Sequence, residues 1–255
     1  VGENPLRYQK SKTCGENIDR MGLDLLGTQN QLVQKIHETG VPTIVVLVGG
    51  RPLSVNWIAQ NVQALVQAWE PGSLGGRALA NILAGKVNPS AKLPISIPRH
   101  SGQIQMIYNH KPSQYFHKYI DGPSTPLYPF GFGLSYTRFA YSSLKLSHTR
   151  ISDKDSFTAS IELTNVGDRE GTEVVQLYIR DIYSSATRPV KELKDFARVT
   201  LKPGEKKTVT FTVTPDKLAY WNRNMQYGVE KGEFEIMIGS SSQDKDLKKV
   251  KMEVL

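Results

Sequence analysis

The spacing of apolar residues changes near residue 137, and this change constrains the fold more than any other feature. Before it, short continuous apolar runs alternate with helical patterns. After it, apolar residues recur at every second position, in segments 157–163, 175–179, 209–213, 234–238 and 250–254. Alternation of this kind is typical of half-buried strands. The sequence therefore predicts two domains: an α/β domain over 1–136 and an all-β, immunoglobulin-like sandwich over 137–255.

The α/β domain is expected to contain a helix that begins near Thr28. Thr28 and Gln31 have the spacing of a capping box, and Gly40 is placed to end the helix. Between them lies an expected apolar face made of Leu32, Val33 and Ile36.

Two apolar runs, 43–48 and 64–69, are typical of strands buried on both faces of a parallel sheet. Helical patterns follow them at 54–61 and 77–85. Strand, helix, strand, helix predicts a partial three-layer α/β sandwich with a mainly parallel sheet. In such sheets ligands bind beyond the carboxyl ends of the strands.

Composition excludes several classes of function. The 255 residues carry a net charge of +8, but the basic residues are scattered, and the densest run, DKDLKKVK, is interrupted by acidic and apolar residues. We therefore expect no nucleic-acid partner. No apolar run approaches the length of a membrane span, so we expect no membrane partner. The single cysteine, Cys14, allows no internal disulfide. The five histidines show no metal spacing, and we expect no metal and no cofactor.

Several stretches, in this order, resemble the C-terminal part of glycoside hydrolase family 3, the β-glucosidase and β-xylosidase family. Among them are GRPLSVNWIAQN, PLYPFGFGLSYTRF, LTNVGDREGTEVVQLYI and RPVKELKDFARVTLKPG, and together the matching stretches span nearly the whole chain. The resemblance implies the family's α/β sandwich domain followed by its fibronectin type III-like domain. Two positions depart from the family pattern: Leu74 stands where Glu is usual, and Ala91 where Gly is usual.

The resemblance also implies a function. Family members hydrolyse terminal β-D-glucosyl or related residues with retention, using a nucleophile on an N-terminal barrel domain that this chain does not contain. The chain is therefore expected to act on a β-glucoside or oligosaccharide as part of a longer enzyme, and to be inactive alone. A periplasmic or secreted location is expected in preference to the cytoplasm, and a homodimer is left open.

Glu16, in the stretch CGENIDR, is the predicted catalytic residue. Retaining hydrolysis needs two carboxyl groups about 5–5.5 Å apart, one as nucleophile and one as acid/base. By resemblance, Glu16 matches the family's acid/base position on a loop of the α/β domain. A solvated loop carboxylate is the competing interpretation. Asp19 and Arg20 are expected to shape the loop by pairing with each other or with nearby backbone.

Three further residues are predicted to bind substrate. Glu3 lies at the carboxyl end of an expected strand, where a crevice would lie. Tyr119 and Asp121 lie in the long loop before residue 136, where simple loop packing is the alternative. Trp221 could stack on a sugar ring. A second function remains open for the chain as a whole: a non-catalytic module whose sandwich binds carbohydrate or a protein.

Overall fold

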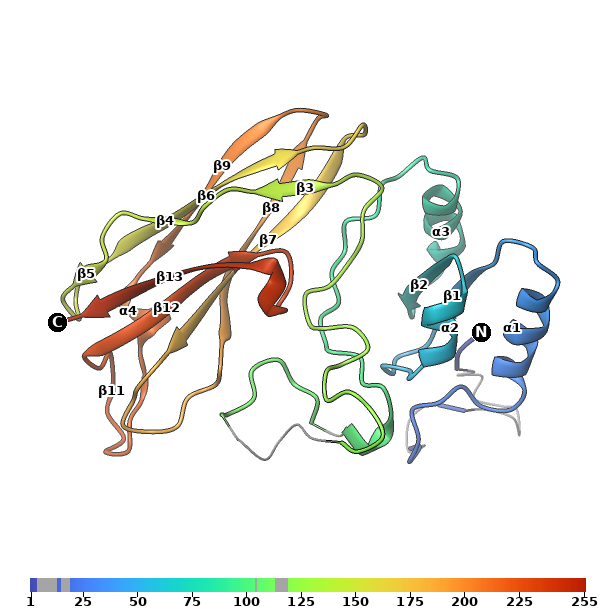
Figure 1. Ribbon diagram of the computed structural model, residues 1–255, viewed down its shortest axis with the longest axis horizontal. Helices are drawn as coiled ribbons and strands as arrows, with labels where there is room; N and C mark the ends of the chain where they lie inside the picture. Colours follow the sequence, from blue (N-terminus) through green and yellow to red (C-terminus); the bar gives the residue numbers. More distant parts are fainter. Residues whose placement is uncertain (4–12, 15–18, 104, 113–118) are drawn as a thin grey trace. The chain divides into compact units, whose positions relative to one another are not determined.

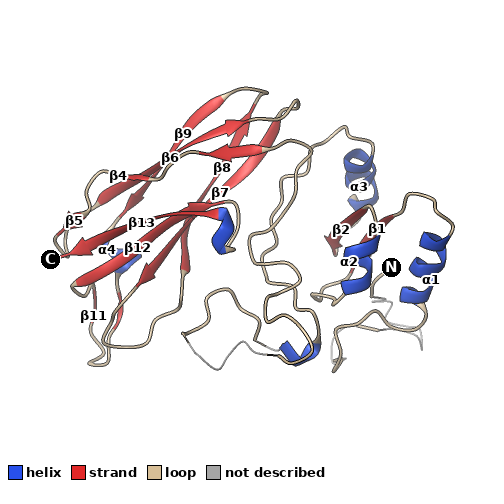
Figure 2. Cartoon of the chain, in the orientation of Figure 1, coloured by secondary structure: helices blue, strands red, loops and turns tan. Residues whose placement is uncertain are grey.

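The computed structural model describes residues 1–3, 13–14, 19–103, 105–112 and 119–255 (Figure 1). The chain divides into two compact units. The α/β unit comprises Val1–Val87, Ser96–Met106 and Lys118–Tyr128. The sandwich unit comprises Asn88–Ile95, Ile107–His117 and Pro129–Leu255. Figure 2 shows that strands dominate the sandwich unit, whereas the longer helices belong to the α/β unit. The domain boundary at residue 136 stays a prediction.

The α/β unit is built from alternating helices and strands. In chain order these are α1 (Gln29–Glu38), β1 (Ile44–Val48), α2 (Asn56–Asn61), β2 (Ala64–Trp69) and α3 (Gly75–Leu83), with a 3₁₀ turn at Ser101–Gln103. Strands β1 and β2 pair in parallel, with Ile44 opposite Ala64. Gly2 adds a parallel bridge to Val48. The predicted parallel β-α-β order is therefore confirmed.

The prediction that both strands are buried on two faces is wrong. Along β1, buried Val45 and Leu47 alternate with Ile44 and Val48, which are 50% and 39% exposed. Successive side chains point to opposite faces of a strand, and only one face of β1 packs on the apolar cluster that α1 and α2 also line. Strand β2 is half-buried throughout most of its length.

The expected start of helix α1 also differs in detail. Thr28 precedes the helix but makes no side-chain capping hydrogen bond, because its backbone (φ −94°, ψ 13°) is not in the extended conformation that a capping side chain needs. Of the expected apolar face, Val33 is buried, whereas Leu32 and Ile36 are 54% and 43% exposed.

The sandwich unit consists of two facing sheets. Its strands are β3 (Phe139–Tyr141), β4 (Lys145–Leu146), β5 (Arg150–Ile151), β6 (Phe157–Asn165), β7 (Gly171–Asp181), β8 (Glu192–Leu201), β9 (Lys206–Val213), β10 (Tyr220–Trp221), β11 (Tyr227–Gly228), β12 (Gly232–Gly239) and β13 (Leu247–Val254), with a short helix α4 (Pro215–Leu218) and a 3₁₀ turn at Asp244–Asp246. One sheet has the order β5-β13-β12-β7-β8; in the other, β6 pairs with β3, β4 and β9. Strands β10 and β11 form a separate hairpin.

The predicted alternation builds the core of the sandwich. Phe157, Ile161 and Leu163 of β6 face Leu177 and Ile179 of β7 within one buried cluster. The cluster continues through Phe211 of β9, Phe234, Ile236 and Ile238 of β12, and Met252 of β13. All five alternating segments read from the sequence are strands, so the predicted immunoglobulin-like sandwich is confirmed.

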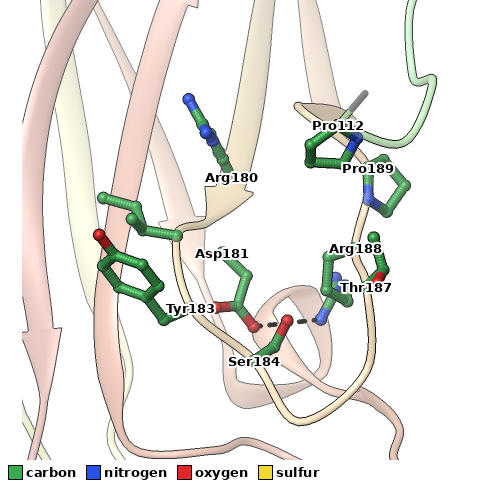
Figure 3. Close-up of a pocket in the computed structure, with 9 residues that line it drawn as sticks. Pro112, Arg180, Asp181, Tyr183, Ser184, Thr187, Arg188 and Pro189 are labelled. Carbon is green, nitrogen blue, oxygen red and sulfur yellow. Dashed lines mark ion pairs between the residues drawn. The ribbon is translucent and has the colours of Figure 1, made fainter. Parts of the chain in front are cut away.

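A hollow of about 180 Å³ opens where β7 ends and the chain turns toward β8 (Figure 3). Asp181, the last residue of β7, lies inside this turn. Its side chain is 2% exposed, and its Oδ2 is 3.7 Å from Nη1 of Arg188.

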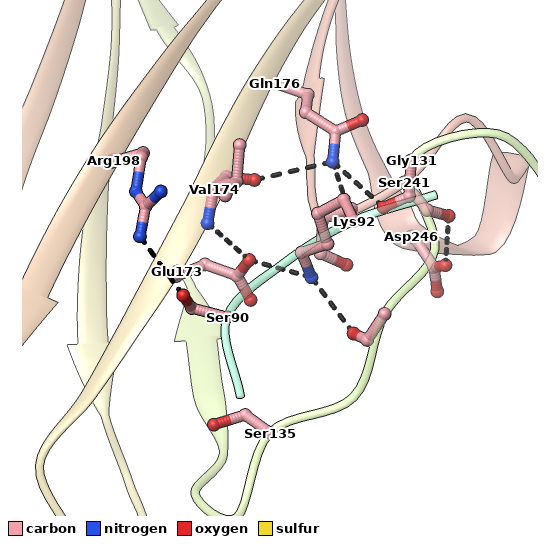
Figure 4. Close-up of polar contacts among 12 residues, drawn as sticks. Ser90, Lys92, Gly131, Ser135, Glu173, Val174, Gln176, Arg198, Ser241 and Asp246 are labelled. Carbon is pink, nitrogen blue, oxygen red and sulfur yellow. Dashed lines mark hydrogen bonds and ion pairs between the residues drawn. The ribbon is translucent and has the colours of Figure 1, made fainter. Parts of the chain in front are cut away.

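Two segments that precede the sandwich strands pack against β7 (Figure 4). Lys92 donates to the carbonyl of Gly133 at 3.1 Å and pairs with buried Glu173 at 2.8 Å. Gly131 approaches the Gln176 side chain so closely that a Cβ would lie 2.1 Å from its Oε1, and it has φ +77°, so glycine is required there.

No helix within the described residues is long and apolar enough to cross a membrane.

Candidate active site

Three strand ends meet at the carboxyl edge of the small parallel sheet. Glu3 donates its N–H to the carbonyl of Val48 at 2.8 Å, and Gly49 donates to the carbonyl of Trp69 at 3.0 Å. The parallel pairing thus brings Glu3, Gly49 and Glu70 to one edge, where open α/β sheets bind ligands.

The Glu3 carboxylate is buried between two guanidinium groups. Its side chain is 1% exposed, and its Oε1 lies 2.6 Å from Nη1 of Arg51 and 3.3 Å from Nη1 of Arg20. Its Oε2 is buried and has no hydrogen-bond partner within the described part of the chain. A buried carboxylate is retained only when paired charges offset its desolvation, and the two arginines do so here.

The backbone beside Glu3 is shaped to admit this carboxylate. Gly49 has φ +146°, and a Cβ on it would lie 2.9 Å from both Cγ and Oε2 of Glu3. A larger residue would therefore force Glu3 away from Arg51. The glycine that ends β1 is thus part of the same arrangement.

The Glu3–Arg20 pair joins the two ends of the segment that contains Glu16. Arg20 also donates to the carbonyl of Asp24, while the exposed carboxylate of Asp19 lies 3.8 Å from Nη2 of Arg51. The expectation that Arg20 bonds to nearby backbone is confirmed; its recorded ion-pair partner is Glu3 and not Asp19. We call Glu3, Arg20 and Arg51 the clasp.

Cys14 lies beside the clasp and is 6% exposed. Burial raises the pKa of its thiol, and the charge of Glu3 raises it further, while Arg51 and Arg20 act in the opposite direction. The thiol is therefore neutral at pH 7. Its reactivity can therefore report on how well it is buried beside the clasp.

The predicted site residues have different positions. Glu16 lies outside the described residues. Tyr119 is 39% exposed, donates to the carbonyl of Gly102 at 3.3 Å and meets His100 edge to face. Asp121 is exposed. Within the described residues, no recorded contact joins Tyr119 or Asp121 to Glu3, and the substrate-binding roles of all three remain predictions.

Arg51 is the functional candidate that the sequence argument missed. It follows the GG that ends β1, so the same strand-end reasoning that selected Glu3 could have selected it. Trp221, on β10, is 61% exposed, and its ring centre lies 5.4 Å from that of Tyr227. Within the described residues, no three His, Cys, Asp or Glu side chains gather in a way that could hold a metal ion.

Two family models match the chain. The C-terminal domain of glycosyl hydrolase family 3 matches residues 2–136, and the fibronectin type III-like domain matches residues 173–242. The chain belongs to glycoside hydrolase family 3. Its α/β fold followed by a fibronectin type III-like sandwich is the C-terminal architecture of that family.

Relatives of known name extend the match over nearly the whole chain. A β-xylosidase of Formosa agariphila is 48% identical over 95% of this chain, and a periplasmic β-glucosidase of Salmonella typhimurium is 43% identical over 89%. A solved β-glucosidase from Erythrobacter marinus superposes on 94% of the chain with a TM-score of 0.90 and 43% identity. A β-glucosidase from Listeria innocua, solved with glucose, superposes on 91% of the chain with a TM-score of 0.86 and 36% identity.

These matches cover only part of each relative. The chain spans 34% of the Formosa protein and 31% of the Salmonella protein. It spans 31% of the Erythrobacter chain and 34% of the Listeria chain. The chain therefore corresponds to about a third of the length of the proteins it matches.

Proposed function

We propose that this chain is the C-terminal part of a retaining exo-glycosidase of the β-glucosidase type, and that Glu16 is its general acid/base. The family match, which covers both units, is the observation that carries the proposal. The clasp supports it, because Glu3 and Arg20 pin the two ends of the segment that contains Glu16 to the carboxyl edge of the sheet.

The chemistry assigned to Glu16 has two steps. A carboxylate on the barrel domain attacks the anomeric carbon, the glycosidic C–O bond breaks, and Glu16 gives its proton to the departing oxygen. A water then attacks the glycosyl-enzyme and gives its proton to Glu16. The bond between the sugar and the barrel carboxylate breaks, the sugar is released, and Glu16 is again protonated. The chain by itself supplies the acid but no nucleophile.

The substrate is proposed to be a terminal β-D-glucosyl or related residue of a glycoside or oligosaccharide. Support comes from the relatives, which are named as β-glucosidases and β-xylosidases. One of them is named as periplasmic, which supports a periplasmic or secreted location for the whole enzyme.

The first test concerns the chain alone. The purified 255-residue protein should not turn over p-nitrophenyl β-glucoside at enzymatic rates, because general acid catalysis contributes only about 10²–10⁴-fold. Joining it to an N-terminal barrel segment should create the activity. Turnover by the chain alone at rates typical of a glycosidase would show that a nucleophile lies within it.

The second test concerns Glu16 in the longer enzyme. Glu16→Ala should slow alkyl glucosides and disaccharides far more than dinitrophenyl glucoside, since a poor leaving group needs the proton most. Azide, which attacks without a general base, should restore turnover and yield a β-glucosyl azide. The matched control is Glu38→Ala, because Glu38 is an exposed glutamate on α1 whose recorded partner is Lys35.

The pattern across substrates decides the assignment. If Glu16→Ala slows every substrate equally and azide changes nothing, Glu16 is a structural residue and another carboxyl group is the acid. If Glu38→Ala reproduces the leaving-group dependence, the effect is not specific to the proposed acid.

A further inference from the structure

The hollow at the end of β7 is half open and is lined by charged, polar and apolar groups (Figure 3). Arg180 and Asp181 come from the end of β7, and Ser184, Thr187 and Arg188 come from the loop that leads to β8. Figure 3 shows the Asp181 carboxylate within the loop, with Tyr183 on one side and Arg188 on the other. The proposed catalytic step does not use this arrangement.

The floor of the hollow holds an unsatisfied acceptor. The Asp181 side chain is 2% exposed, and its Oδ2 has no hydrogen-bond partner among the residues described. Nη1 of Arg188, at 3.7 Å, is beyond hydrogen-bond distance. A buried acceptor without a donor costs free energy, and a ligand hydroxyl that reached the floor would remove that cost.

Arg188 is already committed to other groups. Its Nη2 lies 2.5 Å from Oε2 of Glu192, its Nη1 donates to the carbonyl of Leu218 at 3.4 Å, and its guanidinium lies 4.4 Å from the centre of the Tyr220 ring. Glu192 therefore balances its charge. The remaining lining charges, Arg180 and Asp181, also balance, so the hollow favours a neutral ligand over an anion or a cation.

The walls of the hollow are partly apolar. Pro112 and Pro189 lie on one side and Tyr183 on the other, and Ile182 also lines the hollow. An apolar cavity of about 150 Å³ holds a six-membered ring the size of benzene, so a hollow of about 180 Å³ has room for one ring of this kind. Pyranose rings combine apolar C–H faces with a rim of hydroxyl groups that both donate and accept.

We propose that this hollow is a saccharide-binding site of the sandwich unit that holds one pyranose ring of a neutral sugar. A ring hydroxyl donates to Oδ2 of Asp181, Arg180 donates to a neighbouring hydroxyl oxygen, and the C–H faces pack on Tyr183 and the prolines. The site uses no residue of the proposed catalytic machinery. It gives the sandwich a binding role of its own, in addition to the proposed hydrolysis.

The test is an amide chemical-shift titration of the 255-residue chain at pH 7.5. The probes are glucose, methyl β-D-glucoside, cellobiose and xylobiose. Saturable shifts should appear at residues 180–189 and at Lys111. Glucuronate, which is negatively charged, should bind more weakly than glucose. Arginine amide tests the alternative that Asp181 receives a basic side chain from a protein partner.

Variants separate binding from folding. Asp181→Asn keeps the shape of the floor, and Arg180→Ala removes a donor at the rim; each should weaken sugar binding about tenfold, the cost of losing one hydrogen bond to a charged group. The control for Arg180→Ala is Arg150→Ala, because Arg150 is a 71% exposed arginine of the same unit whose recorded partner is Glu253. Tyr183→Ala should also weaken binding, whereas Phe196→Ala, on β8, should not.

Every outcome bears on the proposal. Should Asp181→Asn fail to fold, Arg180→Ala and Tyr183→Ala decide the question, since Tyr183 is exposed and Arg180 is only half-buried. The proposal is overturned if no sugar shifts residues 180–189 up to its solubility limit, if the sugar shifts lie only outside this loop, or if arginine amide binds there and the sugars do not. Equal affinity in Arg180→Ala and the unmodified chain would overturn it as well.

Discussion

The two units differ in how much apolar surface their folds bury. The sandwich buries an extended apolar cluster between two sheets, with side chains such as Leu177 and Ile236 fully buried. The α/β unit buries a much smaller cluster around Val45 and Ile58, and leaves Ile44 exposed on the other face of β1. Apolar burial therefore stabilises the sandwich more strongly than the α/β unit.

The α/β unit instead places a buried charge at its functional edge. Glu3 is held by Arg51 and Arg20, and such a group contributes specificity of position more than net stability. From this difference we infer that the sandwich is the more stable of the two units. The predicted catalytic segment belongs to the less stable one. Four substitutions can break or sharpen this contrast.

The largest effect is expected from the core of the sandwich. Phe234 is 1% exposed, so Phe234→Ala should destabilise this unit by about 3–5 kcal/mol. Hydrogen exchange of the amides in β6, β7 and β12 measures this unit separately from the other. Phe196→Ala, which removes an aromatic ring that is 60% exposed, should change the same exchange rates little. Equal effects would mean that the core is not where the structure places it.

The clasp should show a smaller, local effect. Glu3→Gln keeps the volume but removes the buried negative charge that pairs with Arg20 and Arg51, which should cost about 1–3 kcal/mol. The reaction of Cys14 with a thiol reagent should become roughly tenfold faster, because a buried thiol reacts through local opening.

The control for the clasp is Asp19→Asn. The Asp19 side chain is fully exposed and lies 3.8 Å from Arg51, so its loss should leave the labelling rate of Cys14 nearly unchanged. If Glu3→Gln and Asp19→Asn accelerate labelling equally, the buried pair does not hold this edge of the sheet.

The third effect is a pH dependence of the sandwich. Burial raises the pKa of Asp181 to about 6, with further upward contributions from Glu230 and Glu192, against the lowering effects of Arg188 and the Tyr183 N–H. Because the folded state keeps a proton that the unfolded chain releases near pH 4, this group lowers the stability as pH rises from about 4 to 6.

Melting temperatures of Asp181→Asn and the unmodified chain, compared at several pH values, isolate this contribution. The melting temperature of the variant should rise relative to that of the unmodified chain between pH 4 and 6. Above pH 7 the difference should grow no further. Other carboxyl groups with lowered pKa, such as Glu192, cancel in the comparison because both proteins contain them. A constant difference across this range would show that Asp181 ionises normally.

The smallest effect is expected on the open face of β1. Ile44→Thr should change the stability by no more than about 0.5 kcal/mol, because Ile44 is 50% exposed. Val45→Thr, at a position that is 5% exposed, should cost more. Equal costs would show that something covers this face in solution, and sedimentation would then reveal whether a second copy of the chain does so.

The sequence predicted the sandwich better than the α/β unit, for a physical reason. Period-two alternation reports burial on one face directly, so strands such as β6 and β12 could be recognised from their own residues. A continuous apolar run such as 43–48 does not report how many faces are covered, since that depends on neighbouring elements. Strand β8, whose burial lacks a regular alternation over its first half, has no period-two pattern from which its bounds could be predicted.

The candidate site was predictable only in part. Strand-end reasoning selected Glu3, but its partner Arg51 is 48 residues away and could not be deduced from local spacing. The capping prediction failed because Thr28 has the right side chain in the wrong backbone conformation. Asp181 was not among the predicted site residues, because the sequence does not distinguish a buried carboxylate after a strand from an exposed one.

The alternation of the chain between its two units has a consequence for how such a sandwich can be inherited. Segment Asn88–Ile95 belongs to the sandwich unit although residues of the α/β unit follow it in the chain. A gene fusion that transferred only the strands from Phe139 onward would leave Lys92 behind. Glu173 would then be a buried acid without its ion-pair partner. A transplanted sandwich would therefore need to bring segment Asn88–Ile95 with it.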